Sequence, residues 1–173
     1  MRKHNGMRPQ DIVLLLKIIS FDQATWQLKD LARELFISPS EVSESLNRSQ
    51  QAGLIDYDKK RVNRQNLMEF LQFGLHYVFP QEPSSMVNGM PTAHAHPYMR
   101  SYFNSDLMYV WPDLHNKERG LAIEPLYSNQ VKACKEDDKL YKLLALIDVI
   151  RVGRVREISV AVKELTKIIL NKP

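Results

Sequence analysis

Basic side chains are concentrated in one short polar segment of the chain. Four cations lie within six residues there: Lys59, Lys60, Arg61 and Arg64. Cations this close together either contact phosphate groups or stay solvated at the tip of a surface turn. The segment follows a Gly53-Leu54-Ile55 step and a predicted helix. We therefore interpret it as a β-hairpin tip that contacts phosphate.

The predicted helix before this hairpin starts at Ser38-Pro39-Ser40-Glu41. Ser38 is expected at the N-cap and Pro39 at the first helical position, with the Glu41 carboxylate accepting from the Ser38 amide. Val42 and Leu46 are four residues apart, so both face inward. Gly53 is expected to end the helix in a left-handed conformation.

The outer face of this capped helix carries the candidate base-reading side chains. They are Ser40, Ser43, Glu44, Asn47 and Arg48. Asn47 has the groups to pair with adenine, Arg48 to pair with guanine or a phosphate, and Glu44 to accept from cytosine. The alternative is that these side chains are simply the solvated face of a surface helix. Glu44 weakens the DNA interpretation because its carboxylate repels phosphate.

Two helices are predicted before the capped helix, the first starting at Pro9, and one after the hairpin. Their apolar side chains recur at helical spacing: Ile12, Leu15, Leu16 and Ile19; Leu28, Leu31, Ala32 and Leu35; Leu67, Phe70, Leu71, Leu75 and Val78. Two helices, a tight turn, a capped helix and a basic hairpin form the order of a winged helix-turn-helix. In that fold the capped helix enters the major groove and the hairpin, or wing, lies against the phosphates.

Residues 28–46 read Leu-Lys-Asp-Leu-Ala-Arg-Glu-Leu-Phe-Ile-Ser-Pro-Ser-Glu-Val-Ser-Glu-Ser-Leu, and residues 52–55 read Ala-Gly-Leu-Ile. In this pattern, residues 8–79 resemble the winged-helix regulators of the multiple-antibiotic-resistance (MarR-like) type. Ser49 departs from the family pattern, which usually has an apolar residue there. The resemblance implies a sequence-specific transcriptional regulator that binds double-stranded DNA as a homodimer, with recognition helices ~34 Å apart.

The composition divides the chain near residue 80. Residues 80–125 hold six of the nine prolines and three of the five histidines. We therefore predict a mainly α fold with a winged helix-turn-helix DNA-binding domain over residues 1–80. Residues 81–173 are predicted to form a loop-rich segment and a C-terminal helical hairpin, serving as a dimerisation or partner/effector module. Five aromatic residues of the loop-rich segment are expected to form a small core: Tyr98, Tyr102, Phe103, Tyr109 and Trp111.

The C-terminal hairpin carries two apolar stripes: Leu140, Leu143, Leu144, Ile147 and Ile150; Ile158, Ala161, Val162, Leu165, Ile168 and Ile169. The hairpin cannot bury both stripes by itself. It is expected either to cover the aromatic segment or to pair with a second copy. Between the stripes, Arg151, Arg154 and Arg156 form either a second phosphate-facing patch or a solvated turn.

Candidate metal and catalytic residues are sparse. His94 and His96 have a spacing that occurs in some zinc sites, but Pro91 and Pro97 indicate a loop, so structural or exposed histidines, His115 included, are favoured. The single cysteine, Cys134, is expected to be inert. No nucleophile elbow, phosphate loop or dinucleotide fingerprint occurs. We expect no catalytic residue, metal or cofactor, and no enzymatic activity.

The net charge of +4 and pI near 9.1 are compatible with a polyanionic partner without requiring one. One cysteine excludes an intrachain disulfide and suits a reducing compartment. Neither a spanning apolar run nor a signal-peptide core is present. The expectation is a cytoplasmic protein with no membrane partner. The alternative function is a winged-helix interaction module, such as an antitoxin-like partner of a toxin that binds through residues 81–173, with DNA binding autoregulatory or absent.

Overall fold

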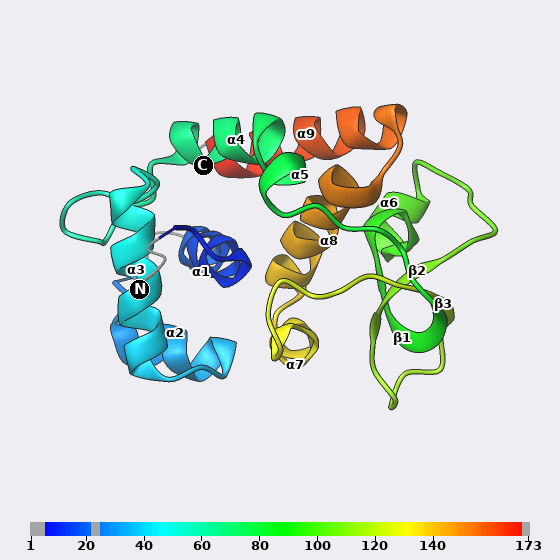
Figure 1. Ribbon diagram of the computed structural model, residues 1–173, viewed down its shortest axis with the longest axis horizontal. Helices are drawn as coiled ribbons and strands as arrows, with labels where there is room; N and C mark the ends of the chain where they lie inside the picture. Colours follow the sequence, from blue (N-terminus) through cyan, green and yellow to red (C-terminus); the bar gives the residue numbers. More distant parts are fainter. Residues whose placement is uncertain (1–5, 22–24, 171–173) are drawn as a thin grey trace, which may run out of the picture.

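The computed structural model describes residues 6–21 and 25–170, which form a mainly helical fold with one small sheet (Figure 1). The elements are α1 (Pro9–Ser20), α2 (Leu28–Leu35), α3 (Pro39–Gln51), α4 (Arg64–Phe73), α5 (Leu75–Val78), β1 (Met86–Thr92), a 3-10 helix η1 (Ala93–Ala95), α6 (Pro97–Arg100), β2 (Tyr109–Pro112), β3 (Arg119–Ala122), α7 (Gln130–Glu136), α8 (Asp138–Val152) and α9 (Val155–Leu170). Among the described helices, none has the length and apolar character needed to cross a membrane.

Helix α1 lies at the centre of the molecule. Figure 1 shows it between α2 and α3 on one side and α8 on the other. The side chains from Ile12 to Leu16 have no solvent exposure. A helix that is apolar all round is expected to be buried on every side. The buried side chains form one cluster that extends from α1 into α8 and α9. The boundary at residue 80 stays a prediction.

The predicted start and end of the capped helix are confirmed in α3. The Glu41 amide donates to Ser38 Oγ at 3.2 Å, and the Ser38 amide donates to Glu41 Oε2 at 2.9 Å. Gly53 follows the C-cap with a φ of +72°, where a side chain would be strained. The Leu54 amide then donates to the Ser49 carbonyl at 2.9 Å, which closes the helix end.

The predicted hairpin is present between α3 and α4. It is formed by a single antiparallel bridge between Ile55 and Val62. At its base the Asn63 amide donates to the Leu54 carbonyl at 2.9 Å. Near its tip, the Asp56 side chain accepts from the Lys60 amide at 2.8 Å, so a side chain shapes the turn.

The loop-rich middle segment contains the three-stranded sheet. Strand β1 pairs antiparallel with β2 and β3, and β2 pairs parallel with β3. The strands approach so closely that a Cβ on Gly89 would lie 2.1 Å from the Trp111 carbonyl oxygen. Trp111 is fully buried, as expected for an aromatic core, whereas Tyr102 is 48% exposed.

A buried carboxylate attaches this sheet to α8. Asp148 accepts from Trp111 Nε1 at 2.6 Å, from Thr92 Oγ1 at 2.8 Å and from Arg151 at 2.8 Å. Burial raises the pKa of Asp148, and the Arg151 charge opposes that shift. Arg151 is itself buried, which corrects both predictions for it: it is neither a phosphate-facing residue nor part of a solvated turn. Arg154 and Arg156 are exposed.

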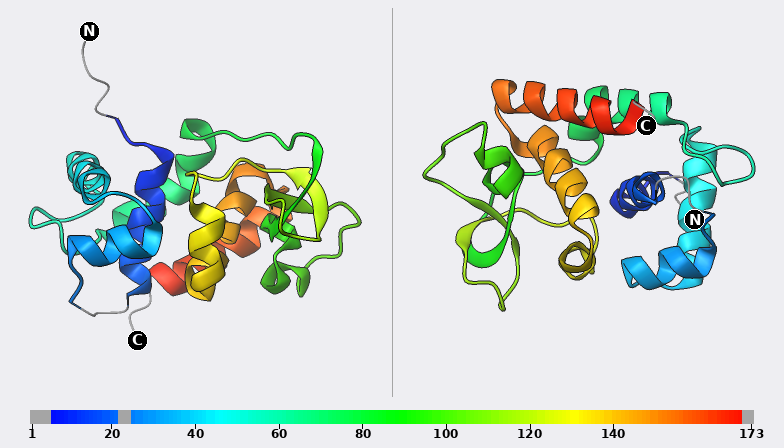
Figure 2. Two further views of the ribbon diagram at one scale, coloured as in Figure 1. Left: turned by 90° about the horizontal axis from the view of Figure 1, so that it is seen from below. Right: turned by 180° about the vertical axis from the view of Figure 1, so that it is seen from behind.

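The predicted C-terminal hairpin is present as α8 and α9. Helix α9 packs against α4 and α8, as the right view of Figure 2 shows, and α8 also packs against α1, α4 and α5. Each apolar stripe is thus covered within the chain, with Leu144 and Leu165 fully buried. Pairing through this hairpin is expected only if its apolar stripes are uncovered. Because α1 and α4 cover them, the stripes no longer argue for pairing. The homodimer itself stays a prediction.

Candidate nucleic-acid interface

The inner face of α3 is fixed to α1 by a buried ion pair. Arg48 donates to the two carboxylate oxygens of Asp11, from Nε at 2.9 Å and from a terminal nitrogen at 2.6 Å. Ser45 Oγ also donates to Asp11, at 2.6 Å. The hydrogen bond to Asp11 raises the pKa of Arg48. Since Asp11 has no solvent exposure, this contact sets how α3 sits on α1.

Arg48 therefore does not lie on the outer face of α3, where the sequence predicts it. It was expected on the outer face of the capped helix, reading guanine or a phosphate. In the structure its side chain points toward α1 and is only 11% exposed. The physical reason is that a buried carboxylate needs a paired cation, and Arg48 is long enough to reach it from the edge of the helix. Arg48 is thus a positioning residue.

Four of the predicted side chains do lie on the exposed face of α3: Ser40, Ser43, Glu44 and Asn47. Ser40 lies next to the cap, with its hydroxyl 3.0 Å from that of Ser38. Glu44 lies 3.8 Å from Arg48, so part of its repulsion toward phosphate is offset. The face thus offers hydroxyl and amide groups for hydrogen bonding and one partly neutralised carboxylate.

The hairpin lies beside this face and is attached to it by Lys59. Lys59 Nζ donates to the Asn47 side-chain oxygen, and Lys59 has a φ of +56°. Lys60 is an exposed residue whose Nζ lies over the Trp26 ring, 4.4 Å from its centre, and donates to the Trp26 carbonyl at 3.4 Å. Arg61 is exposed and makes no ion pair within the described residues. The structure thus brings three of the four predicted cations to the hairpin.

The fourth cation, Arg64, is separate from them. It is the first residue of α4, and it donates to the Ile169 carbonyl at 2.8 Å. The last carbonyls of a helix have no partner within it, so Arg64 satisfies one at the end of α9. This corrects the prediction that Arg64 contacts phosphate as part of the hairpin. The hairpin ends at Asn63, and Arg64 binds the end of α9.

The turn between α2 and α3 has a support that the sequence analysis missed. Phe36 adopts a left-handed conformation, with a φ of +55°. Its carbonyl accepts from Asn129 at 2.7 Å, and Lys132 of α7 lies 3.9 Å from the centre of its ring. These partners are more than 90 residues away along the chain, so no local pattern could indicate them.

The histidines and the cysteine have structural environments. His94 binds the Leu107 carbonyl at 2.6 Å, and buried His96 caps α6 by accepting from the Tyr98 amide at 3.1 Å. His115 is exposed. Within residues 6–21 and 25–170, no three His, Cys, Asp or Glu side chains are grouped as metal ligands. Burial raises the pKa of the Cys134 thiol, which keeps it protonated.

The exposed face of α3 and the adjacent hairpin form one polar surface. Side-chain contacts attach both, α3 through Asp11 and the hairpin through Asn47 and Trp26. The hydrogen-bonding groups lie on the helix and the cations on the hairpin. No family model matches the chain, and no curated protein or solved structure is significantly similar to it.

Proposed function

We propose that this protein is a sequence-specific DNA-binding transcriptional regulator of the winged helix-turn-helix type. Helices α2 and α3 are the helix-turn-helix, α1 is the supporting helix, and the hairpin over residues 54–63 is the wing. The proposal rests on a difference between the two faces of α3. Its inner face is fixed by Asp11, while Ser40, Ser43 and Asn47 are exposed beside the wing.

In this proposal Asn47 reads a base edge. An asparagine amide can form two hydrogen bonds with adenine in the major groove. In the free protein the Asn47 oxygen accepts from Lys59, which sets the orientation of the amide. On DNA, a phosphate competes for the Lys59 ammonium, and the Asn47 oxygen becomes free to accept from adenine. Lys59 thus changes partner when the wing meets the backbone.

The remaining wing cations position the protein without reading sequence. The Arg61 side chain makes no ion pair among the described residues, so none must break before it contacts a phosphate. Lys60, an exposed residue, is held at the edge of the hairpin by the contact of its Nζ with Trp26. Such contacts strengthen binding to every DNA and make it dependent on salt.

The test compares base reading with phosphate contact. A DNA site is first selected from a random pool, and binding to that site and to random DNA is measured across a salt series. Asn47→Ala is expected to cost ~1–3 kcal/mol on the selected site alone. Arg61→Ala is expected to weaken both DNAs and lower the salt slope by about one. Arg119→Ala is the matched control, since Arg119 is exposed on β3, far from α3 (Figure 1).

Two results would overturn the proposal. Equal losses for Asn47→Ala on both DNAs would mean that α3 does not read sequence. Absence of binding by the unaltered protein to any DNA at low salt would remove the regulator function. The alternative, an interaction module such as an antitoxin-like partner, would then remain.

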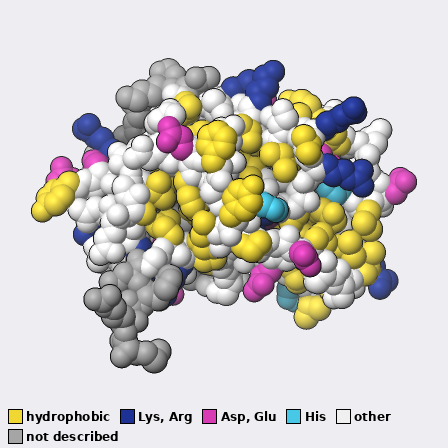
Figure 3. Space-filling model, turned by 45° about the horizontal axis from the view of Figure 1, so that its top comes forward, with side chains coloured by type: hydrophobic (Ala, Val, Ile, Leu, Met, Phe, Trp, Pro, Cys, Tyr) yellow, Lys and Arg dark blue, Asp and Glu magenta, His cyan; other side chains and the backbone are white. Residues whose placement is uncertain are grey.

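We further propose that two copies associate through an aromatic face on α4 and α5. Phe73, Tyr77 and Val78 are 68%, 81% and 51% exposed. Figure 3 shows apolar side chains gathered on this side of the molecule. Glu69 is the only Asp, Glu, Lys or Arg in residues 65–80. Each of two identical faces therefore brings only one charge from this segment, so like-charge repulsion between them is small.

Sedimentation of the purified protein tests this association. The unaltered protein is expected to sediment as a dimer at micromolar concentration, and Tyr77→Glu as a monomer, because a charge would be buried in the interface. Leu114→Glu is the matched control, since Leu114 is 93% exposed outside this face. A monomeric unaltered protein, or a dimer unaffected by Tyr77→Glu, would exclude pairing through α4 and α5.

A further inference from the structure

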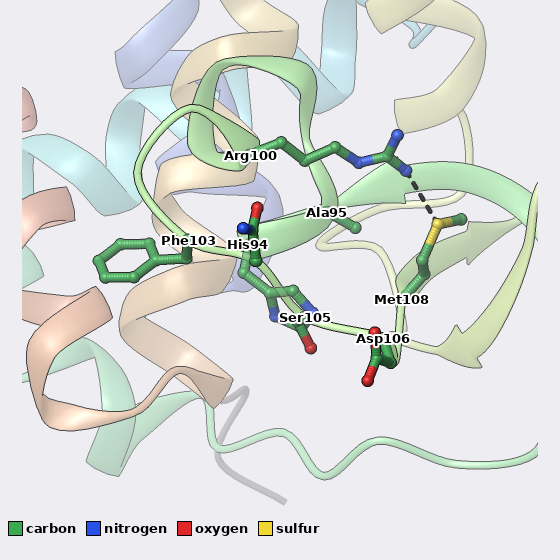
Figure 4. A pocket seen from close by; sticks show the side chains of 8 residues that line it. His94, Ala95, Arg100, Phe103, Ser105, Asp106 and Met108 are labelled. Atoms are coloured by element: carbon green, nitrogen blue, oxygen red, sulfur yellow. Dashed lines mark hydrogen bonds between the residues drawn. The ribbon is translucent and has the colours of Figure 1, made fainter.

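A cavity of about 520 Å³ lies between the η1–α6 segment and the chain before β2. Figure 4 shows its lining: Arg100 and Asp106 carry the charges, His94 adds an imidazole, and Phe103, Ala95 and Met108 add apolar surface. Its size is in the range of small-molecule sites. None of these residues contributes to the proposed DNA interface.

Within residues 6–21 and 25–170, neither of the two charges that line the cavity has a charged partner, and both residues are exposed. The Arg100 guanidinium donates only to Met108 Sδ within the described chain, at 2.8 Å, and a thioether is a weak acceptor. Asp106 makes no side-chain hydrogen bond or ion pair within those residues. Although Arg100 and Asp106 line the same cavity, they do not pair with each other there. One cation and one anion are thus available to a ligand in the same cavity.

The His94 side chain, which lines the cavity, is held in place. His94 Nε2 lies 2.6 Å from the Leu107 carbonyl oxygen, which can only accept. This nitrogen therefore carries the proton, and in the neutral ring Nδ1 is an acceptor. The ring also packs edge-on against Tyr109, with centroids 4.5 Å apart. The preceding residue, Ala93, has a φ of +50°, a strained conformation of the kind that collects at binding sites.

We propose that this cavity binds a small zwitterion, of the class of free α-amino acids. Arg100 would bind the carboxylate, since a guanidinium can hold both carboxylate oxygens. Asp106 would bind the ammonium group. Phe103, Ala95 and Met108 would contact an apolar side chain. A ligand with both charges can bind to Arg100 and Asp106 together, whereas a simple anion would be repelled by Asp106.

The test is a titration of the isotope-labelled full chain followed by amide NMR. The probes are L-leucine, L-methionine and L-phenylalanine, with N-acetyl-L-leucine and L-leucinamide as analogues that lack the ammonium charge or the carboxylate. We expect saturable shifts in residues 94–108 from at least one of the three amino acids, and at least tenfold weaker binding of both analogues.

Two variants identify which side chain binds each charged group of the amino acid. Arg100→Gln should weaken the amino acid while leaving L-leucinamide unchanged, and Asp106→Asn should weaken the amino acid while leaving N-acetyl-L-leucine unchanged. Arg119→Gln, an exposed cation on β3, is the control and should bind as the unaltered protein does.

Three outcomes would overturn the proposal. One is the absence of saturable shifts with all three amino acids up to about 10 mM, an affinity too weak to distinguish from non-specific contact. Another is equal binding of N-acetyl-L-leucine, which would show a simple anion site. The third is binding that persists in both variants, which would place the ligand elsewhere. None of these outcomes bears on DNA binding by α3.

Discussion

Arg48 and Asp11 bind each other across 37 residues of sequence, through two hydrogen bonds of 2.6 and 2.9 Å. Asp11 also accepts from the Arg8 amide at 2.8 Å at the start of α1. One carboxylate therefore both caps α1 and orients α3. The helix proposed to read DNA is positioned by a charge that never reaches the surface.

Arg48→Ala should destabilise the fold instead of selectively abolishing base reading. It would leave the Asp11 carboxylate buried without its cation, which typically costs ~3–5 kcal/mol. The free energy of unfolding is measured by urea titration. Glu44→Ala is the control on the same helix and should change it by less than about 0.5 kcal/mol. If the two losses are equal, the ion pair does not hold α3.

Two buried serines on α3 should respond in opposite directions to alanine substitution. Ser45→Ala removes a hydrogen bond to the Asp11 carboxylate and should cost ~1.5–3 kcal/mol. The Ser49 hydroxyl is buried without a hydrogen-bond partner among the described residues. Ser49→Ala should therefore leave stability unchanged or raise it by up to ~1 kcal/mol. Urea unfolding of both variants decides this, and a loss for Ser49→Ala would reveal a hidden partner.

The α3 cap should give an acid-dependent loss of stability. Ser38→Ala is expected to cost ~1 kcal/mol by removing the N-cap acceptor. The pKa of Glu41 is lowered because its carboxylate accepts from the Ser38 amide and hydroxyl. Its contribution is thus present above the usual pKa of 4.5 and is lost as the pH falls through the lowered pKa.

Glu41→Gln should accordingly be less stable than the unaltered chain near neutral pH, and this gap should be smaller at an acidic pH below the lowered pKa of Glu41. Thermal unfolding at the two pH values measures the difference. A gap that is the same at both would show that the carboxylate charge adds nothing to the cap.

His96 should make the protein less stable in mild acid. Burial lowers its pKa from 6.5 to about 4, and the nearby Lys142 charge acts in the same direction. The unfolded chain therefore binds a proton between these values that the folded protein does not. Stability should fall as the pH drops from 6.5 toward 4.

His96→Asn isolates this titration. An Asn oxygen can accept from the Tyr98 amide as His96 Nδ1 does, so the α6 cap is kept. The variant should show a smaller loss of unfolding free energy over that pH interval. His115→Asn is the control, because His115 is exposed. An unchanged pH slope in His96→Asn would assign the acid sensitivity to another group.

The local signals predicted the elements of the first 80 residues well. Ser38, Glu41 and Gly53 act within five residues of the groups they bind, so their spacing alone indicates where α3 begins and ends. The hairpin follows from the polar segment between two short apolar stretches. The C-terminal hairpin follows from two apolar stripes at helical spacing, which stay amphipathic whatever covers them.

The assignment of individual cations depended on tertiary structure. Asp11, Arg48 and Arg64 all read as ordinary charged residues on helices, and periodicity cannot tell which charge will be buried. Arg48 is bound 37 residues away, at Asp11, and Arg64 is bound 105 residues away, at Ile169. Periodicity and capping determined by themselves that α3 exists and which face carries Asn47. Long-range packing around α1 decided which side chains remain for a ligand. A buried carboxylate needs a cation, and an unpaired carbonyl at a helix end needs a donor, so a long basic side chain nearby binds each of them.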